Sequence, residues 1–150
     1  MWLGGSDVAG TRDDSPRPTD LGPIDEARRA LYERLRAAPP EVLTTRPASG
    51  DWSVIENVRH LLYAERRHFG RLLPKGFAWD PIGLPTGGVP RRTGAGTAST
   101  DDLEEVLAAW DQVHGAIRLD AVDREQAVRA VERNLLHLRN HVRYIDHTLG

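Results

Sequence analysis

Four segments of this chain repeat apolar residues at the spacing of an α-helix, and no segment alternates convincingly as a β-strand does. We predict helices over residues 23–37, 54–73, 101–119 and 123–149. The clearest stripe lies in the last segment and consists of Ala127, Val131, Leu135, Leu138, Val142, Ile145 and Leu149. Because a helix with one apolar stripe buries it against another element, four such helices predict an all-α fold, a four-helix bundle.

Local signals mark several helix ends. Ser53 and Glu56 fit a capping box at the start of the second helix, and Trp52 stands at the position of a hydrophobic staple. Pro74 directly follows the predicted end of that helix. Asp101 with Glu104 is the expected cap of the third helix.

The remaining segments are rich in Gly, Pro and polar residues. Residues 1–22 have no apolar period, and we expect them to form a disordered arm before a single domain over 23–150. Residues 41–50 form a connector with room for a short turn of helix. Residues 74–99 form a long loop whose scattered apolar residues predict that it lies over the domain as a lid.

Composition narrows the function classes. The chain has no cysteine, which excludes disulfides, thiolate metal ligands and a cysteine nucleophile, and weakly favours a cytoplasmic protein. A net charge of −2 argues against a general nucleic-acid binder. No stretch approaches the roughly 18 apolar residues of a membrane span, so we expect no membrane partner.

The histidines give the best indication of chemistry. His137 and His141 are four residues apart, which places both imidazoles on one helical face. His60 on the second helix would complete a site of three nitrogens with an open position, the arrangement of catalytic rather than structural metal sites. The helical wheel places His60 away from the apolar stripe, near Glu56 and Arg67, so a solvated histidine stays the alternative.

The other three histidines are not favoured as metal ligands. His114 lies in the stripe of the third helix, where a hydrogen-bonded core histidine is favoured over a ligand. His68 and His147 are predicted to be exposed. The sequence lacks the HExxH motif of zinc proteases, because Leu138 follows His137.

Residues 52–61, which read WSVIENVRHL, are followed four positions later by Glu65. This segment resembles the W-S-x-x-E-x-x-x-H-L opening of helix two in the DinB/YfiT-like superfamily. The pair His137 and His141 is similar to the family's second metal element, and the resemblance covers about residues 24–149.

The resemblance implies an up-down-down-up bundle that binds nickel, zinc or iron through His60, His137 and His141, often as a homodimer. It also implies a thiol-dependent S-transferase or isomerase that uses bacillithiol, mycothiol or glutathione. A metal-dependent hydrolase with the same site is the second choice. Either enzyme would act on a small-molecule substrate.

Three polar residues are candidates for orienting the ligands or handling protons, namely Asn134, Tyr144 and Glu56. Two features depart from the family pattern. The segment between the third and fourth helices is short, and Tyr144 stands where relatives often have glutamine. A non-catalytic, stress-related bundle that has lost its metal is therefore an open alternative, and a DNA-binding helical protein is the least favoured one.

Overall fold

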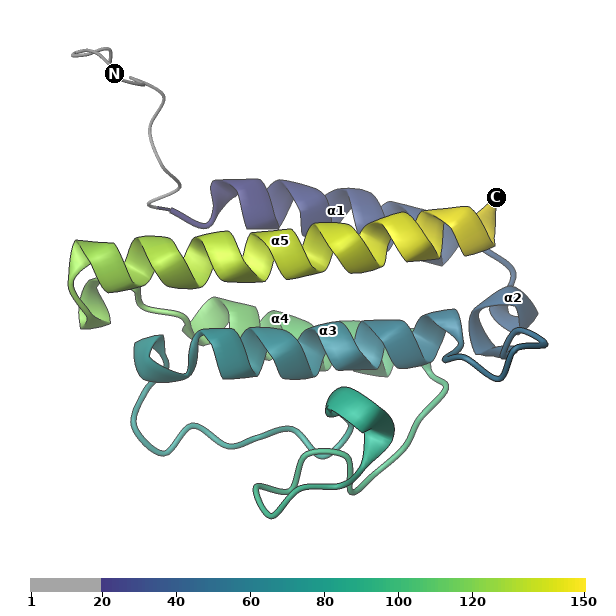
Figure 1. Ribbon diagram of the computed structural model, residues 1–150, viewed down its shortest axis with the longest axis horizontal. Helices are drawn as coiled ribbons and strands as arrows, with labels where there is room; N and C mark the ends of the chain where they lie inside the picture. Colours follow the sequence, from purple (N-terminus) through teal and green to yellow (C-terminus); the bar gives the residue numbers. More distant parts are fainter. Residues whose placement is uncertain (1–19) are drawn as a thin grey trace, which may run out of the picture.

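The apolar stripes lie in four long helices that pack along one another (Figure 1). This computed structural model describes residues 20–150, so most of the predicted arm lies outside the described residues. The helices are α1 (Gly22–Ala37), α2 (Pro40–Thr44), α3 (Val54–His68), α4 (Leu103–Ala116) and α5 (Arg124–Leu149). Short 3₁₀ turns are η1 (Gly70–Leu72), η2 (Thr86–Gly88) and η3 (Leu119–Ala121). Residues 20–150 contain no strand, so the all-α prediction is confirmed.

Two of the four helices are shorter than the sequence predicts. α3 ends at His68, because Phe69 leaves helical geometry and Gly70 favours the tighter turn η1. α4 begins after Asp102, whose side chain accepts a hydrogen bond from the Glu104 N–H, so Asp101 is not the cap. The predicted bounds of α1 and α5 are confirmed to within one residue, and the connector does contain the short helix α2.

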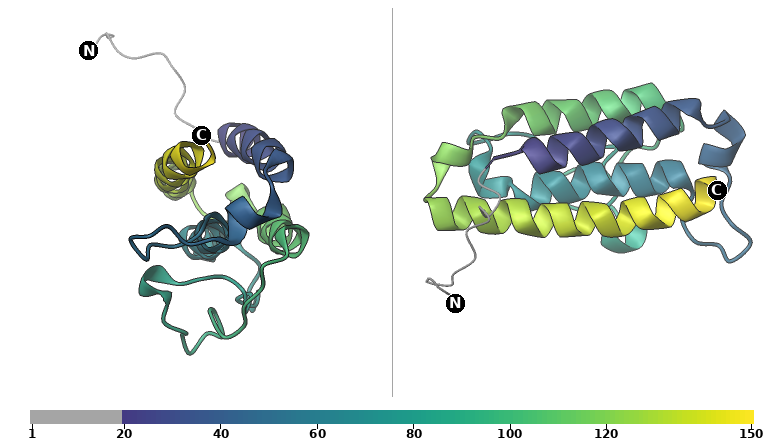
Figure 2. Two further views of the ribbon diagram at one scale, coloured as in Figure 1. Left: turned by 90° about the vertical axis from the view of Figure 1, so that its right-hand side faces the viewer. Right: turned by 90° about the horizontal axis from the view of Figure 1, so that it is seen from above.

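The helices surround one apolar core. α3 packs against both α4 and α5, and α1 packs mainly against α5 and less closely against α4 (Figure 2). The largest fully buried side chains come from every long helix and include Ile24, Leu62, Phe69, Trp110, Leu138 and Ile145. No helix among residues 20–150 is long and apolar enough to cross a membrane.

The loop over residues 74–99 covers the side of α3 that faces away from α1 (Figures 1 and 2). The guanidinium of Arg59 donates hydrogen bonds to the carbonyl oxygens of Ile82 at 2.8 Å and Ala98 at 3.0 Å. The N–H of Leu84 in turn donates to the Arg59 carbonyl at 3.1 Å. The expectation that this loop lies over the domain is confirmed, and its action as a lid stays a prediction.

Candidate metal centre

His60 of α3 and His137 and His141 of α5 meet in the groove between the two helices. One ring nitrogen from each lies within 4.8 Å of the other two. The Nε2 atoms of His60 and His137 are 3.3 Å apart. The i,i+4 spacing on α5 brings the second pair of rings to 4.5 Å between centroids, as the sequence predicted. Three imidazoles therefore converge on one point.

His60 is buried, which corrects the position that the helical wheel gave it. Its side chain lies beneath the 74–99 loop, where its Nδ1–H donates to the Leu84 carbonyl at 2.8 Å. A helical wheel drawn from the sequence shows only which face of α3 is apolar and packs against other helices. Because the loop buries the opposite face, every residue from Val54 to Glu65 except Glu56 is buried.

Hydrogen bonds fix the outer ring nitrogen of two of the three histidines. The Asn57 side-chain N–H donates to the Ser53 carbonyl at 3.0 Å, so the Asn57 Oδ1 faces His141 as an acceptor. The His141 Nδ1–H donates to it at 3.0 Å. His60 and His141 therefore carry their proton on Nδ1 and present an Nε2 lone pair, the state of a histidine that binds metal. The Nδ1 of His137 is buried without a partner among residues 20–150.

The three rings are held neutral. Burial lowers the pKa of His60. Burial, together with the charge that His141, His60 and His68 would carry, lowers the pKa of His137 to about 4. Burial and the neighbouring His60 likewise lower the pKa of His141 to about 4. Metal binding requires deprotonated imidazole, so this cluster needs no proton removal near pH 7.

The donor set fits a divalent cation. Two nitrogens at tetrahedral positions around an ion, each about 2.0–2.1 Å away, are about 3.3–3.4 Å apart. The Nε2 atoms of His60 and His137 match this separation. Because His60 is protonated on Nδ1, its Nε2 lone pair faces the Nε2 atom of His137. A cation bound between the two rings would be coordinated by both nitrogens.

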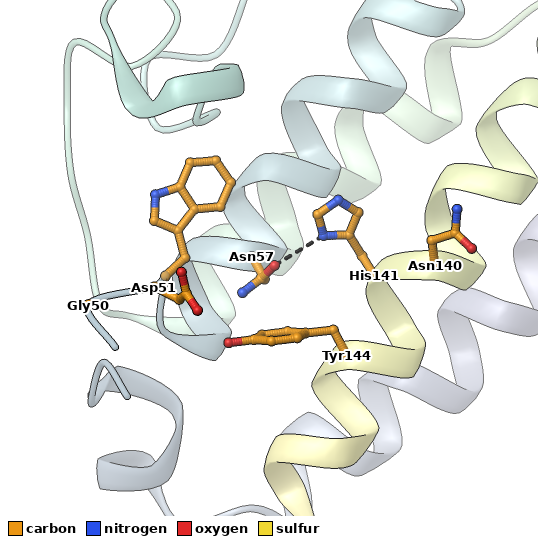
Figure 3. Close-up of a pocket in the computed structure, with 7 residues that line it drawn as sticks. Gly50, Asp51, Asn57, Asn140, His141 and Tyr144 are labelled. Carbon is orange, nitrogen blue, oxygen red and sulfur yellow. Dashed lines mark hydrogen bonds between the residues drawn. The ribbon is translucent and has the colours of Figure 1, made fainter. Parts of the chain in front are cut away.

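A pocket of about 490 Å³ opens beside His141 (Figure 3). His141 and Tyr144 extend from α5 toward Asn57, and the pocket is completed by residues of the connector before α3. The lining residues are Gly50, Asp51, Trp52, Asn57, Asn140, His141 and Tyr144. Trp52 also contacts His60, with 5.2 Å between ring centroids, so it belongs to the wall of the site as well as to the helix start.

The three polar candidates take different positions. Tyr144 lines the pocket and is 38% exposed. Asn134 is buried behind the cluster, where it donates to Glu65 at 3.2 Å and its Oδ1 accepts from His68 at 2.9 Å. Glu56 completes the predicted capping box with Ser53 and forms an ion pair with Arg46. The hydrogen bond to Arg46 is the main cause that lowers the pKa of Glu56 to about 2.

Several residues that contribute to the site were not predicted from the sequence. His68 is half-buried rather than exposed, and its ring lies edge-on to His137 with 5.4 Å between centroids. Asn57 and the Leu84 carbonyl orient two of the three histidines, and only the spacing of Asn57 four residues after the capping serine could have indicated its role. His147 is exposed, as predicted.

His114 is the hydrogen-bonded core histidine that the sequence favoured. Its Nδ1 lies 2.6 Å from Oε2 of Glu65, a fully buried carboxylate. Its Nε2 bonds to Asp25 of α1. The Trp110 N–H and the Asn134 side-chain N–H donate to the other Glu65 oxygen at 3.0 Å and 3.2 Å, so this cluster links all four long helices. It contains none of the three convergent rings, and Asn134 connects it to His68.

Comparison with known proteins identifies a family for most of the chain. The family model of the DinB superfamily matches residues 24–125, a stretch that runs from α1 through α4 and contains His60. No curated protein and no solved structure matches the chain. The matched stretch spans most of the bundle and contains the WSVIENVRHL segment. The histidine pair of α5 lies outside this stretch, and the structure brings it together with His60. The chain belongs to the DinB superfamily.

Proposed function

We propose that this protein is a divalent-metal-dependent enzyme whose ligands are His60, His137 and His141. The observation that carries the proposal is the convergence of three neutral imidazoles, two of which have their outer nitrogens fixed by buried acceptors. Three histidines leave coordination positions open for a substrate or water, as in catalytic sites. Nickel, zinc and iron all suit imidazole ligands.

The favoured reaction is transfer of a small-molecule thiol to an electrophile, or a thiol-dependent isomerisation. A bound divalent ion would act as a Lewis acid that lowers the pKa of a coordinated thiol or water. Because the chain has no cysteine, the sulfur would come from a low-molecular-weight thiol such as mycothiol or bacillithiol. The pocket beside His141 has room for a small electrophile, and the Tyr144 hydroxyl is placed to donate a hydrogen bond to it.

The family resemblance supports two further proposals about assembly. The first is an up-down-down-up helix order, which is supported by the long loop between α3 and α4 and the short joints elsewhere (Figure 1). The second is a homodimer, for which sedimentation equilibrium is the direct measurement. A cytoplasmic location likewise stays a prediction.

Metal analysis tests the site. We expect untagged protein to bind one zinc or nickel ion per chain, and His141→Ala to lower the affinity by roughly 10–100-fold or more. His147→Ala is the matched control, because His147 lies on the same helix but is exposed. If wild-type protein takes up no metal at micromolar zinc or nickel, the proposed function is wrong.

An activity screen then separates the reaction classes. Metal-loaded protein is incubated with mycothiol, bacillithiol or glutathione and a panel of electrophiles, and thiol loss is measured. We expect consumption that depends on both thiol and metal. Ester or amide hydrolysis that proceeds without any thiol would instead identify a hydrolase. Full metal binding with neither activity would favour a non-catalytic bundle.

A further inference from the structure

A second pocket of the α3–α5 groove is lined by four arginines. Arg67 and Arg71 come from the end of α3 and from η1, and Arg129 and Arg133 come from the first half of α5. The members of each pair are four residues apart. The pocket has a volume of about 470 Å³, and its other lining residues are His68, Gly70, Leu72, Val122, Gln126 and Ala130.

The positive charge of this pocket is not neutralised by the lining. No aspartate or glutamate lines the pocket. Among residues 20–150, none of the four guanidinium groups forms an ion pair, in contrast to Arg28, Arg36 and Arg46, which pair with Asp111, Glu104 and Glu56. Like charges gathered at one place repel each other and attract anions.

One side chain of the pocket wall is half-buried and hydrogen-bonded. This side chain is His68, which lines the pocket together with the four arginines. The His68 Nδ1–H donates to Asn134, whose amide is fixed by Glu65, so the ring is held in place. The four arginine side chains are exposed, and the hydrogen-bonded His68 ring is a fixed part of the pocket wall.

His68 also connects this pocket with the histidine cluster. Its ring lies edge-on to His137 at 5.4 Å between centroids. Along α5, Arg129, Arg133, His137 and His141 follow one another at helical spacing on the face toward α3. The arginine pocket thus lies on one side of the cluster, and the pocket of Figure 3 lies on the other.

We propose that the arginine pocket is a binding subsite for a phosphate or carboxylate group of a small molecule. Guanidinium groups bind both oxyanions through paired hydrogen bonds, and Gln126 adds a neutral donor. The pocket is concave and confined to one end of the groove, and the chain has a net charge of −2; both features favour a small anion over a nucleic-acid backbone. That this anion belongs to the substrate or thiol of the histidine cluster rests on the proposed function.

Anion titration of the full chain tests this subsite. Inorganic phosphate, pyrophosphate and citrate are titrated at low salt by calorimetry and by NMR of the arginine side chains. Comparing the affinities of the two phosphates with that of citrate shows whether the subsite prefers a phosphate or a carboxylate. We expect saturable binding that shifts the Arg129 and Arg133 signals. The double variant Arg129→Gln/Arg133→Gln should bind roughly tenfold or more weakly, because hydrogen bonds to charged groups are lost.

The matched control is Arg139→Gln/Arg143→Gln, which removes the same charge from exposed positions of α5 that do not line the pocket. We expect this control to bind anions as the wild type does, and Arg133→Gln alone to give an intermediate affinity if the double variant unfolds. Equal loss in the two double variants, no saturable binding, or tighter binding of duplex DNA than of any small anion would overturn the proposal.

The same titration in His141→Ala separates the two proposals. Anion binding that persists in this variant belongs to the arginine pocket and not to a metal. If wild-type protein binds anions but no metal, the proposed function fails and the subsite stands. If it binds metal but no anion, the subsite fails and the proposed function stands.

Discussion

At the scale of single residues, Asn57 connects the start of α3 with the candidate metal ligand His141. Its amide N–H donates to the Ser53 carbonyl, and its Oδ1 accepts from the His141 Nδ1. Acceptors of this kind hold a ligand's tautomer and ring orientation. Asn57 is itself buried, so water cannot replace it easily.

We expect Asn57→Leu to weaken zinc affinity by about 10–100-fold, because it keeps the side-chain volume but removes the acceptor of His141. Competition with a chromophoric chelator measures the affinity, and the urea midpoint reports the fold. Unchanged zinc affinity in a folded variant would show that this hydrogen bond does not orient a ligand.

The pair formed by His114 and Glu65 makes the stability of the protein depend on pH. Burial by itself would lower the pKa of His114, but its hydrogen bond to Glu65 and the Glu65 charge raise it above 6.5. The protonated ring lies between two carboxylates, those of Glu65 and Asp25. Its contribution to stability is therefore complete below the unfolded pKa of about 6.5 and is lost as pH rises through the higher folded pKa.

We expect His114→Leu to lower the free energy of unfolding by about 3 kcal/mol at pH 6, because it leaves the buried Glu65 carboxylate without its cation. The loss relative to wild type should shrink as pH rises above the folded pKa of His114. Urea unfolding from pH 5.5 to 9 measures both effects, with His147→Leu as the exposed control. A deficit that is the same at every pH would contradict the assignment.

The sequence predicts some of these residues and not others. The i,i+4 pair of α5 and the core position of His114 depend on helical periodicity alone, and both predictions are confirmed in their geometry. His60 and His68 were placed wrongly, because their burial comes from segments distant in sequence. The 74–99 loop covers His60, and Asn134 of α5 holds His68.

At the scale of elements, Arg59 joins α3 to the loop that covers it. Its guanidinium donates to the carbonyls of Ile82 and Ala98. The Arg59 carbonyl accepts from Leu84, the same residue whose carbonyl orients His60. One arginine thus holds the loop at residues 82–84 and at Ala98 against the helix that carries a candidate ligand.

We expect Arg59→Leu to free the loop while the bundle stays folded. Amide hydrogen exchange should rise at least about tenfold for residues 82–98, because opening the loop no longer breaks these hydrogen bonds. Exchange of the core amides of α4 should stay unchanged. Arg29→Leu, at an exposed position of α1, is the control. Equal protection of the loop in both variants would show that apolar packing alone holds it.

Helix ends were predictable where a side chain caps them and not where the tertiary structure ends them. The Ser53–Glu56 capping box was predicted from the sequence and is present. The end of α4 was not visible. There the Arg118 N–H donates to the Leu72 carbonyl at 2.8 Å, a contact between distant segments that draws the chain out of the helix.

At the scale of the whole molecule, the histidine cluster joins α3 to α5, which lie far apart in the chain. Four amphipathic segments were enough to predict the bundle, because each stripe has to be buried. Their order of packing and the two pockets of the α3–α5 groove were not predictable, since these depend on how the helices and the loop fit together.

Metal binding at this position should stabilise the entire bundle, because the unfolded chain does not hold the three histidines together. At a free zinc concentration 100 times the dissociation constant, the expected gain is about 2.7 kcal/mol. For a domain of this size, that gain corresponds to a rise of roughly 5–10 °C in the unfolding midpoint. Differential scanning calorimetry with and without a chelator measures the shift. His141→Ala should remove it and His147→Ala should retain it, whereas a shift that survives in His141→Ala would locate the metal elsewhere.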